Sequence, residues 1–366
     1  MARYHRLFLA ALVVVSLTGC FRRIKYENPI TRETAQPDKV LFDKAIEDLE
    51  KGRYQVARLT LQTLINTYDT SEYLARAKLA LADSWFREGG SHGLAQAEAE
   101  YKDFILFYPN LEEAAEAQAK ICMIHYRQME KPDRDPTHAV RADEECRLLM
   151  EQFPNSVHVA EMEQRLREIQ EVIAEGEFRV GEFYFKKGSY AASVNRLENL
   201  VNHYPLFSKA DQALWHVAQA YERLGSRFQD RAIAALQRIV RDYPLSPLAD
   251  EAKRRLRELE AEIPEPDPVA LARMEYDLEN KQQPGLWSRF WGAFRKNPDV
   301  REAAKSGTPA SEPLRPTTPI TVPGAAGSAA TGATAEVTIA PVQGPSALDT
   351  QPDARRNPPQ QQQQQR

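Results

Sequence analysis

The stretch that decides the fold is Glu177–Pro205, EFRVGEFYFKKGSYAASVNRLENLVNHYP. Its apolar and small residues recur at three- and four-residue spacing on both sides of Gly188, which predicts two short helices joined by a turn. Gly188 suits the end of the first helix, because glycine accepts the left-handed conformation that closes helix C-termini. Ser189 can cap the second helix. Tyr204 precedes a proline and should end it, because proline disfavours helical geometry in the residue before it.

The two predicted helices also carry small residues where they would face each other. Gly181 and Ser193 would let the helices approach closely. Together with Tyr184, Tyr190 and the terminal Pro205, they form a pattern of small and aromatic residues that resembles one tetratricopeptide repeat (TPR).

The same pattern recurs along residues 38–262. Five copies have predicted stops at Asp69, Pro109, Pro154, Pro205 and Pro244, which lie 39 to 51 residues apart. A regular TPR has a period of about 34 residues, so these units are irregular and contain insertions. The predicted fold is all-α: a TPR-like solenoid of five irregular helical hairpins with a closing helix. A bundle of unrelated amphipathic helices is the alternative.

The N-terminus reads as a lipoprotein signal peptide. Arg3 and Arg6 precede the apolar run Leu7–Leu17, which is too short to cross a bilayer as a helix. Leu17-Thr18-Gly19-Cys20 then resembles the bacterial lipoprotein signal box, in which the cysteine is lipidated and becomes the mature N-terminus. An ordinary cleaved signal followed by a chance cysteine is the alternative. We therefore expect residues 1–19 to be removed and Cys20 to be the lipid anchor.

Residue 21 and the polar stretch after it indicate where in the cell envelope the protein resides. Phe21 is not the aspartate that often retains such lipoproteins at the inner membrane, so we expect a lipid-anchored protein on the periplasmic face of the outer membrane. Residues 20–37 read as a tether, although part of them could pack on the repeats.

Two further cysteines, Cys122 and Cys146, fall on the two predicted helices of the third repeat. Antiparallel packing could bring them together as a disulfide. Since the facing of each helix is not fixed by sequence, we favour two small buried side chains over a bridge.

The composition of the chain changes after the repeats. Ile263–Pro268 is a linker, residues 269–283 predict one short helix, and residues 263–285 as a whole connect the repeats to an aromatic segment. Residues 286–296, LWSRFWGAFRK, predict a basic amphipathic helix that could lie on a membrane, dock in a partner or pack on the repeats. Its apolar face would consist of Leu286, Trp287, Phe290, Trp291 and Phe294. Residues 297–366 are rich in Pro, Ala, Thr and Gln and are predicted to be disordered.

Composition and motifs exclude several functions. The net charge is −4, and no basic stripe with interleaved aromatics marks a nucleic-acid interface. Phosphate loops, zinc-binding histidine pairs and nucleophile elbows are absent from the sequence, and its histidines lack metal-ligand spacing. We therefore expect no cofactor and no metal site. A glycosidase with paired carboxylates stays open as an alternative, although no feature of the sequence singles out such a pair.

Two short stretches carry a more specific resemblance. Residues 133–139, DRDPTHA, and residues 194–196, VNR, are similar to runs in repeats three and four of the BamD family, lipoproteins of the outer-membrane β-barrel assembly machinery. The resemblance covers about Cys20–Pro244. It departs at Asp69, where a proline is expected.

The resemblance implies a function and partners. Such proteins are scaffolds and substrate receptors, without enzymatic activity, in the assembly and insertion of outer-membrane β-barrels. They bind the periplasmic domains of a BamA-like β-barrel subunit, other assembly lipoproteins and unfolded outer-membrane proteins. The resemblance therefore implies a contact with the BamA-like subunit at Asn195 and Arg196.

A stacked repeat array would provide a concave groove lined by the first helices. Candidate groove residues are Arg76, Asp83, Phe86 and Arg87 in repeat two, and Tyr126 and Arg127 in repeat three. The aromatic side chains suit the aromatic end of a barrel protein, and the arginines suit its terminal carboxylate.

Two other functions compete with this one. A TPR lipoprotein adaptor of another envelope machine, such as one that coordinates peptidoglycan synthesis, would share the architecture but not the 133–139 and 194–196 runs. An envelope enzyme built on a helical solenoid, such as a lytic transglycosylase, would need a lysozyme-like domain, for which no segment remains.

Overall fold

The structure, a computed structural model, describes residues 35–280 and 297–312. In that part of the chain there are twelve α-helices, one short 3-10 helix and no strand, which confirms the all-α prediction. The helices are α2 (Pro37–Glu50), α3 (Tyr54–Thr67), α4 (Leu74–Glu88), α5 (Gly90–Phe107), α6 (Glu112–Gln128), α7 (Thr137–Gln152), α8 (Val159–Lys186), α9 (Tyr190–His203), α10 (Ala210–Leu224), η1 (Ser226–Phe228), α11 (Gln229–Asp242), α12 (Ala249–Glu258) and α13 (Pro268–Glu279).

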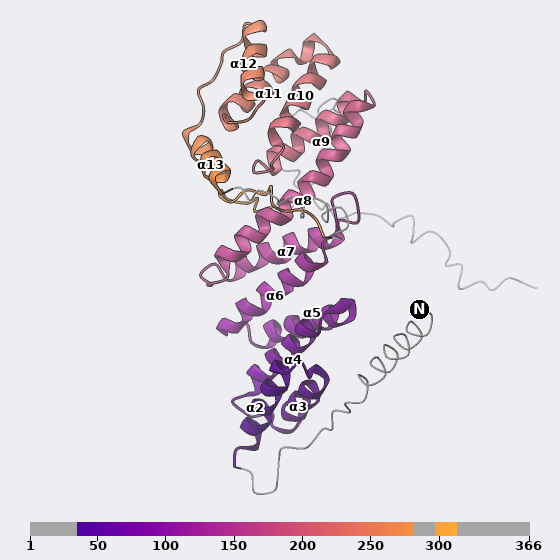
Figure 1. Cartoon of the computed structure of the whole chain (residues 1–366), viewed down its shortest axis with the longest axis vertical. Helices are drawn as coiled ribbons and strands as arrows, with labels where there is room; N and C mark the ends of the chain where they lie inside the picture. The colour runs from indigo at the N-terminus through magenta and orange to yellow at the C-terminus, as the bar shows by residue number, and fades with distance from the viewer. Residues whose placement is uncertain (1–34, 281–296, 313–366) are drawn as a thin grey trace, which may run out of the picture. The chain divides into compact units, whose positions relative to one another are not determined.

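The helices α2 to α11 form five consecutive hairpins, each packed against the next (Figure 1). The second helix of every hairpin ends two residues before its predicted stop, at Thr67, Phe107, Gln152, His203 and Asp242. The five-hairpin prediction is therefore confirmed, and α12 packs on α11 after the last hairpin.

Each apolar core is shared between neighbouring hairpins. Leu41 of α2 and Leu61 of α3 are fully buried and share one core with Leu81 of α4, so the first helix of repeat two closes the core of repeat one. The next core likewise joins Tyr101 of α5 to Ile121 of α6. One TPR-like unit does not bury its apolar face alone, and this sharing stabilises the stack.

The deciding hairpin confirms the close approach expected from its small residues. Ser193 Oγ donates a hydrogen bond to the carbonyl oxygen of Gly181 at 2.9 Å, and a Cβ atom on Gly181 would overlap the Leu197 side chain. Gly188 has φ 76°, as a left-handed helix end requires. Ser189 takes the N-cap position of α9, but its side chain makes no capping hydrogen bond.

The prediction of a short first helix in this hairpin is wrong, because α8 is 28 residues long. No proline interrupts it between Val159 and Lys186, and its early residues have their own core to fill. Leu166 packs in the core of repeat three, whereas Phe178 packs in that of repeat four. One helix thus joins the two halves of the array.

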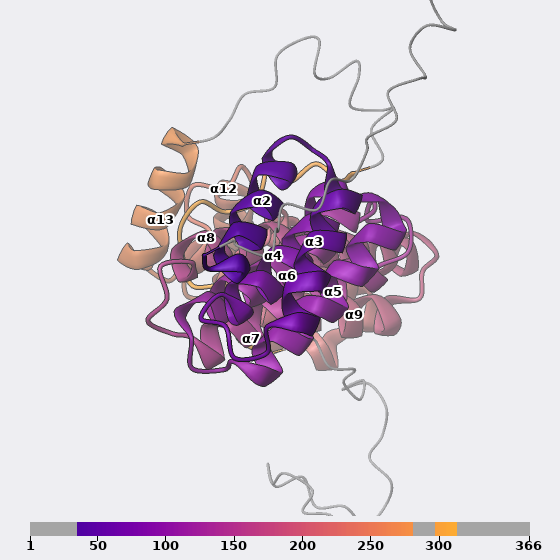
Figure 2. The same ribbon diagram turned by 90° about the horizontal axis from the view of Figure 1, so that it is seen from below.

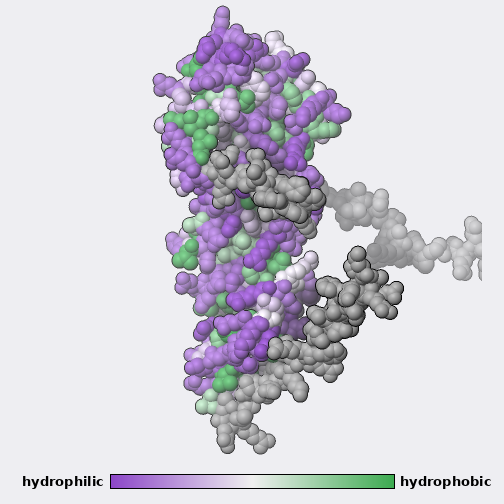
Figure 3. All heavy atoms as spheres, in the orientation of Figure 1, coloured by the Kyte–Doolittle hydropathy of each residue, from purple (hydrophilic) through white to green (hydrophobic). Residues whose placement is uncertain are grey.

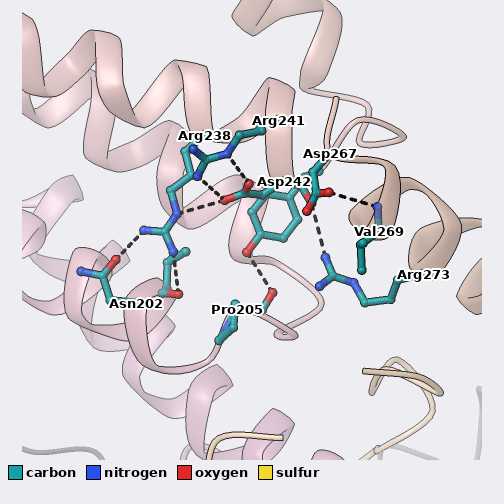
Figure 4. A network of polar contacts seen from close by, with 10 residues as sticks. Asn202, Pro205, Arg238, Arg241, Asp242, Asp267, Val269 and Arg273 are labelled. Carbon is teal, nitrogen blue, oxygen red and sulfur yellow. Dashed lines mark hydrogen bonds and ion pairs between the residues drawn. The ribbon is translucent and has the colours of Figure 1, made fainter. Parts of the chain in front are cut away.

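The short helix expected over residues 269–283 is α13, which ends at Glu279, one residue before the described segment closes. Figures 1 and 2 show that it lies to one side of the hairpins. Figure 4 shows its attachment: Arg273 donates to the carbonyl oxygen of Asp242 at 3.3 Å, and the Asp267 carboxylate caps Val269 N at 3.0 Å. Arg238 and Arg241 of α11 also converge on the Asp242 carboxylate there.

The prediction of disorder from residue 297 onward is wrong for residues 297–312, which lie against α8 and α13. Ala303 is 3% exposed and Ala304 is 9% exposed. The small side chains suggested disorder because they bury little area, but hydrogen bonds to the main chain hold this segment. Residues 313–366 lie outside the described part.

The face of the array seen in Figure 3 is mostly hydrophilic, with separate apolar patches. Among the described helices, none combines the length and hydropathy that a bilayer-spanning segment needs.

Candidate functional site

Asp83, a predicted groove residue, lies where α4, α5 and α6 meet. It accepts hydrogen bonds from Tyr101 Oη at 2.5 Å and from Lys120 Nζ at 2.6 Å. Burial and the neighbouring carboxylate raise the pKa of the Tyr101 phenol well above its usual value, so the phenol remains a donor at neutral pH. Asp83 therefore organises the junction of repeats two and three.

Phe86 and Arg127 are brought together from different repeats. The Arg127 guanidinium lies 4.1 Å from the centre of the Phe86 ring, and Phe86 in turn packs edge-on against Tyr101. Phe86 is half-buried and Arg127 is exposed. The pair places an aromatic ring and a cation side by side at the surface. The ring can contact an apolar side chain, and the guanidinium can bind a carboxylate.

Tyr126 lies one residue before Arg127 and faces the next repeat. Its hydroxyl donates to Glu168 at 2.6 Å, and the Arg165 guanidinium lies 5.2 Å from its ring centre. Burial and the hydrogen bond to Glu168 raise the pKa of Tyr126 to about 12. The tyrosine ties α6 to α8.

The remaining two predicted groove residues are exposed. The Arg76 guanidinium lies 4.9 Å from the Phe42 ring centre in repeat one, so Arg76 is a contact of α4 with α2. Arg87 lies in the exposed last turn of α4. The structure thus groups Asp83, Phe86 and Arg127, and places Arg76 with the preceding repeat.

A polar cluster that sequence reasoning missed lies between α5, α6 and α7. Glu98, His125 and Glu145 place ligand-type atoms within 4.8 Å of one another. Lys102 Nζ already bridges the two carboxylates, at 2.8 Å from Glu98 and 3.0 Å from Glu145. Burial lowers the pKa of His125, which favours its neutral form. The bridging lysine offsets one of the two negative charges, and the cluster forms a polar junction between repeats two and three.

The 133–139 run lies at the start of α7. Asp135 accepts hydrogen bonds from Thr137 N at 3.0 Å and from Thr137 Oγ1 at 2.6 Å, which fixes the first turn of the helix. His138 stacks on His125, with 3.3 Å between their Nδ1 atoms. Within the described residues, the run therefore shapes the turn between α6 and α7.

The predicted partner residues Asn195 and Arg196 lie on α9. Arg196 is exposed, and its guanidinium pairs with Glu177 of α8 at 3.0 Å. Asn195 is half-buried. The ion pair holds Arg196 at the surface, where a partner's carboxylate could reach it.

The preference for unbridged cysteines is wrong: Cys122 and Cys146 form a disulfide, with Cα atoms 5.1 Å apart. Both side chains are fully buried, because α6 and α7 turn these positions toward each other across the hairpin. The disulfide covalently joins the two helices of the third repeat, α6 and α7.

Several predicted features lie outside the described residues. They are the signal peptide of residues 1–19, the lipid anchor Cys20 with most of the tether, and the aromatic segment with Leu286, Trp287, Phe290, Trp291 and Phe294.

Comparison with known proteins gives consistent results. The model of a family described as "YfiO: Outer membrane lipoprotein" matches residues 34–231, more than half of the chain. The outer membrane protein assembly factor BamD of Vibrio cholerae is 25% identical over 198 residues, covering 52% of this chain and 81% of that protein. The protein of the same name from Xylella fastidiosa is 23% identical over 251 residues, covering 66% of this chain and 84% of that protein. The one from Caulobacter vibrioides is 21% identical over 216 residues, covering 59% and 69%.

Proposed function

The chain belongs to the YfiO family of outer membrane lipoproteins, and from this membership we propose that it is a non-catalytic scaffold and substrate receptor. It functions in outer membrane protein assembly, as its relatives named BamD do, and it associates with the outer membrane and its assembly machinery. Its specific partners would be the periplasmic domains of a BamA-like subunit and unfolded outer-membrane proteins. Lipidation of Cys20 would anchor it on the periplasmic face.

The Phe86–Arg127 pair carries the substrate part of the proposal. An unfolded barrel protein offers aromatic side chains and a terminal carboxylate, and the pair presents a partner group for each. Asp83 and Tyr101 support the ring from behind through their hydrogen bond and the edge-on contact. The groove receptor is thus a surface held in place by buried residues of two repeats.

The test is binding of a urea-diluted outer-membrane protein to the purified chain. Phe86→Ala and Arg127→Ala should each weaken binding about tenfold, because each removes one half of the stacked pair. Arg179→Ala, which removes an exposed arginine of α8, is the matched control. Unchanged binding by both variants would exclude this surface as the receptor.

Co-purification from solubilised membranes tests the partner part. The chain should retain a BamA-like barrel subunit. A Cys20→Ala variant should be lost from the membrane fraction, since a lipid anchor would be absent. Normal palmitate labelling of that variant would contradict the anchor assignment.

A further inference from the structure

Residues 301–312, here called the strap, run alongside α8 and bond to it at a constant offset in residue number. Three α8 side chains, one helical turn apart, donate to three main-chain carbonyl oxygens of the strap: Gln164 to Ala304 (3.4 Å), Arg167 to Gly307 (2.9 Å) and Gln170 to Ala310 (2.8 Å). The two members of every pair are 140 residues apart in the sequence. Figure 1 shows the strap as the orange trace beside α8.

Gln170 is the centre of this contact. Besides donating to the Ala310 carbonyl, it accepts a hydrogen bond from Ala310 N at 2.9 Å, so its amide pairs with both main-chain groups of one strap residue. Gln170 is 6% exposed and also donates to Asp143 at 3.2 Å. Asp143, itself 3% exposed, binds Arg147 at 2.7 Å, and Arg147 reaches the carbonyl oxygen of Ser311 at 3.5 Å. A buried carboxylate thus orients the two side chains that hold the strap's end.

The opposite side of the strap is held by α13. The Asp277 carboxylate accepts from Lys305 N at 2.9 Å and from Ser306 N at 3.1 Å. The buried strap side chains are small: Ala303, Ala304 and Pro309. Most of the recognition is therefore of main-chain groups, which any polypeptide offers.

The strap does not fill its site. A cavity of about 160 Å³ lies beside Ala303 and Ala304, bordered by Met274 and Leu278 of α13 and by Leu206. The alanine methyl groups leave this partly apolar space open. A bulkier apolar side chain in place of Ala304 would have room there and would lose part of its contact with water.

We propose that this surface of α7, α8 and α13 is a polypeptide-binding site, which the strap occupies in cis and an unfolded polypeptide with a bulky apolar side chain occupies in trans. The family match ends at residue 231, so the strap and α13 belong to the part of the chain beyond it. The site is separate from the Phe86–Arg127 surface, and either assignment can fail without the other.

The covalent link determines how the two occupants compete. The strap is tethered to its own site, so its effective concentration is high even if its intrinsic affinity is low. A free peptide with the strap's sequence should bind poorly to the intact chain and well to a chain without the strap. A peptide that fills the cavity should compete better.

The experiment measures fluorescence anisotropy of a labelled peptide of residues 299–312, DVREAAKSGTPASE, with the full chain and with a variant lacking residues 297–312. We expect the deletion variant to bind at least tenfold more tightly than the full chain. Replacing Ala304 of the peptide by Leu should lower the Kd at least fivefold on the deletion variant. It should also give measurable binding to the full chain.

One change in the peptide, which cannot disturb the protein's fold, and one change in the protein separate this site from non-specific adhesion. A peptide N-methylated at Ala310 loses the hydrogen bond that Ala310 N donates to Gln170 and should bind at least tenfold more weakly. Gln170→Ala in the deletion variant should do the same, whereas Gln212→Ala on α10 should change nothing. A deletion variant that no longer melts cooperatively would show that the strap is a fixed part of the fold. That result would overturn the proposal. It would also be overturned if a folded deletion variant did not bind the peptide, or if the methylated peptide bound as well as the unmodified one.

Discussion

Ser193 donates its hydroxyl hydrogen to the carbonyl oxygen of Gly181 at 2.9 Å, and this bond joins α8 to α9 where a single added carbon would collide with Leu197. The bond satisfies a buried hydroxyl, since Ser193 is fully buried. The two small residues therefore do more than leave space: one supplies the acceptor and the other the donor that fix the hairpin.

Gly181→Ala should destabilise the array. The added methyl group overlaps the Leu197 side chain, and overpacking of this kind costs about 1–3 kcal/mol. Alanine's better helix propensity would recover only about 0.5–1 kcal/mol of that loss. Urea unfolding should show a lower midpoint for Gly181→Ala, with Val180→Ala on the exposed face of α8 close to the parent. Equal midpoints would mean that the helices can separate at no cost.

The hairpin spacing was predictable from sequence because turn glycines and X-Pro stops act locally. Gly188 and Tyr204 fix their own backbone geometry, so the helix ends followed directly. The length of α8 did not follow, because the stretch before Glu177 has no proline to end a helix and the two cores that α8 fills lie in different repeats. The position of the strap was also not predictable from sequence, since main-chain carbonyl groups are the same in every residue.

The disulfide should contribute substantially to stability. Closing a loop with a sequence separation of 24 residues contributes about 3 kcal/mol in the chain-entropy account. The double variant Cys122→Ser/Cys146→Ser should therefore unfold at clearly lower urea concentration than the non-reduced parent. Dithiothreitol should shift the parent toward the variant and leave the variant unchanged.

Free thiols in the non-reduced protein would contradict the bridge. Mass spectrometry after alkylation without reductant checks this directly, with the reduced and alkylated chain as the reference. Modification at both Cys122 and Cys146 before reduction is the contrary result.

Glu171 should make stability depend on pH. Burial raises its pKa from 4.5 to about 7, although Ser208 N donates to it at 3.0 Å and Lys209 is near. Between these values the folded chain holds a proton that the unfolded chain has released. The free energy of unfolding therefore falls as pH rises from about 4.5 to 7, by about 3 kcal/mol from this group.

Glu171→Gln removes this titration and should abolish that part of the decline. Urea unfolding of parent and variant at several pH values from 4.5 to 8 measures the difference, which should grow in the variant's favour as pH rises. Glu151→Gln, at an exposed position near the end of α7, is the control and should track the parent. Parallel curves for Glu171→Gln and the parent would show that this carboxyl titrates normally.

The site was only partly predictable, because its contacts cross repeat boundaries. Phe86 and Arg127 could be placed on first helices from their spacing, but the stacking of one on the other depends on how repeats two and three pack. The same holds for His125 and Glu98, which come from different repeats and show no shared motif. Local patterns identify helix faces, whereas the register between helices comes from core packing.

Arg196 provides the last test, that of partner binding. Its ion pair with Glu177 is exposed and is expected to contribute less than about 1 kcal/mol to folding, so charge reversal should leave the fold intact. If the same guanidinium pairs with a carboxylate of a BamA-like subunit, Arg196→Glu should weaken the complex by about 2 kcal/mol or more, since the reversed charge repels its former partner. Surface plasmon resonance with the purified periplasmic domains measures this loss of affinity.

Two variants serve as controls for Arg196→Glu. Glu177→Gln should bind at least as well as the parent, because it frees Arg196 for the partner. Lys51→Glu reverses a charge of similar exposure in repeat one and should be neutral. A folded Arg196→Glu variant that binds like Lys51→Glu would place the partner contact elsewhere on the array.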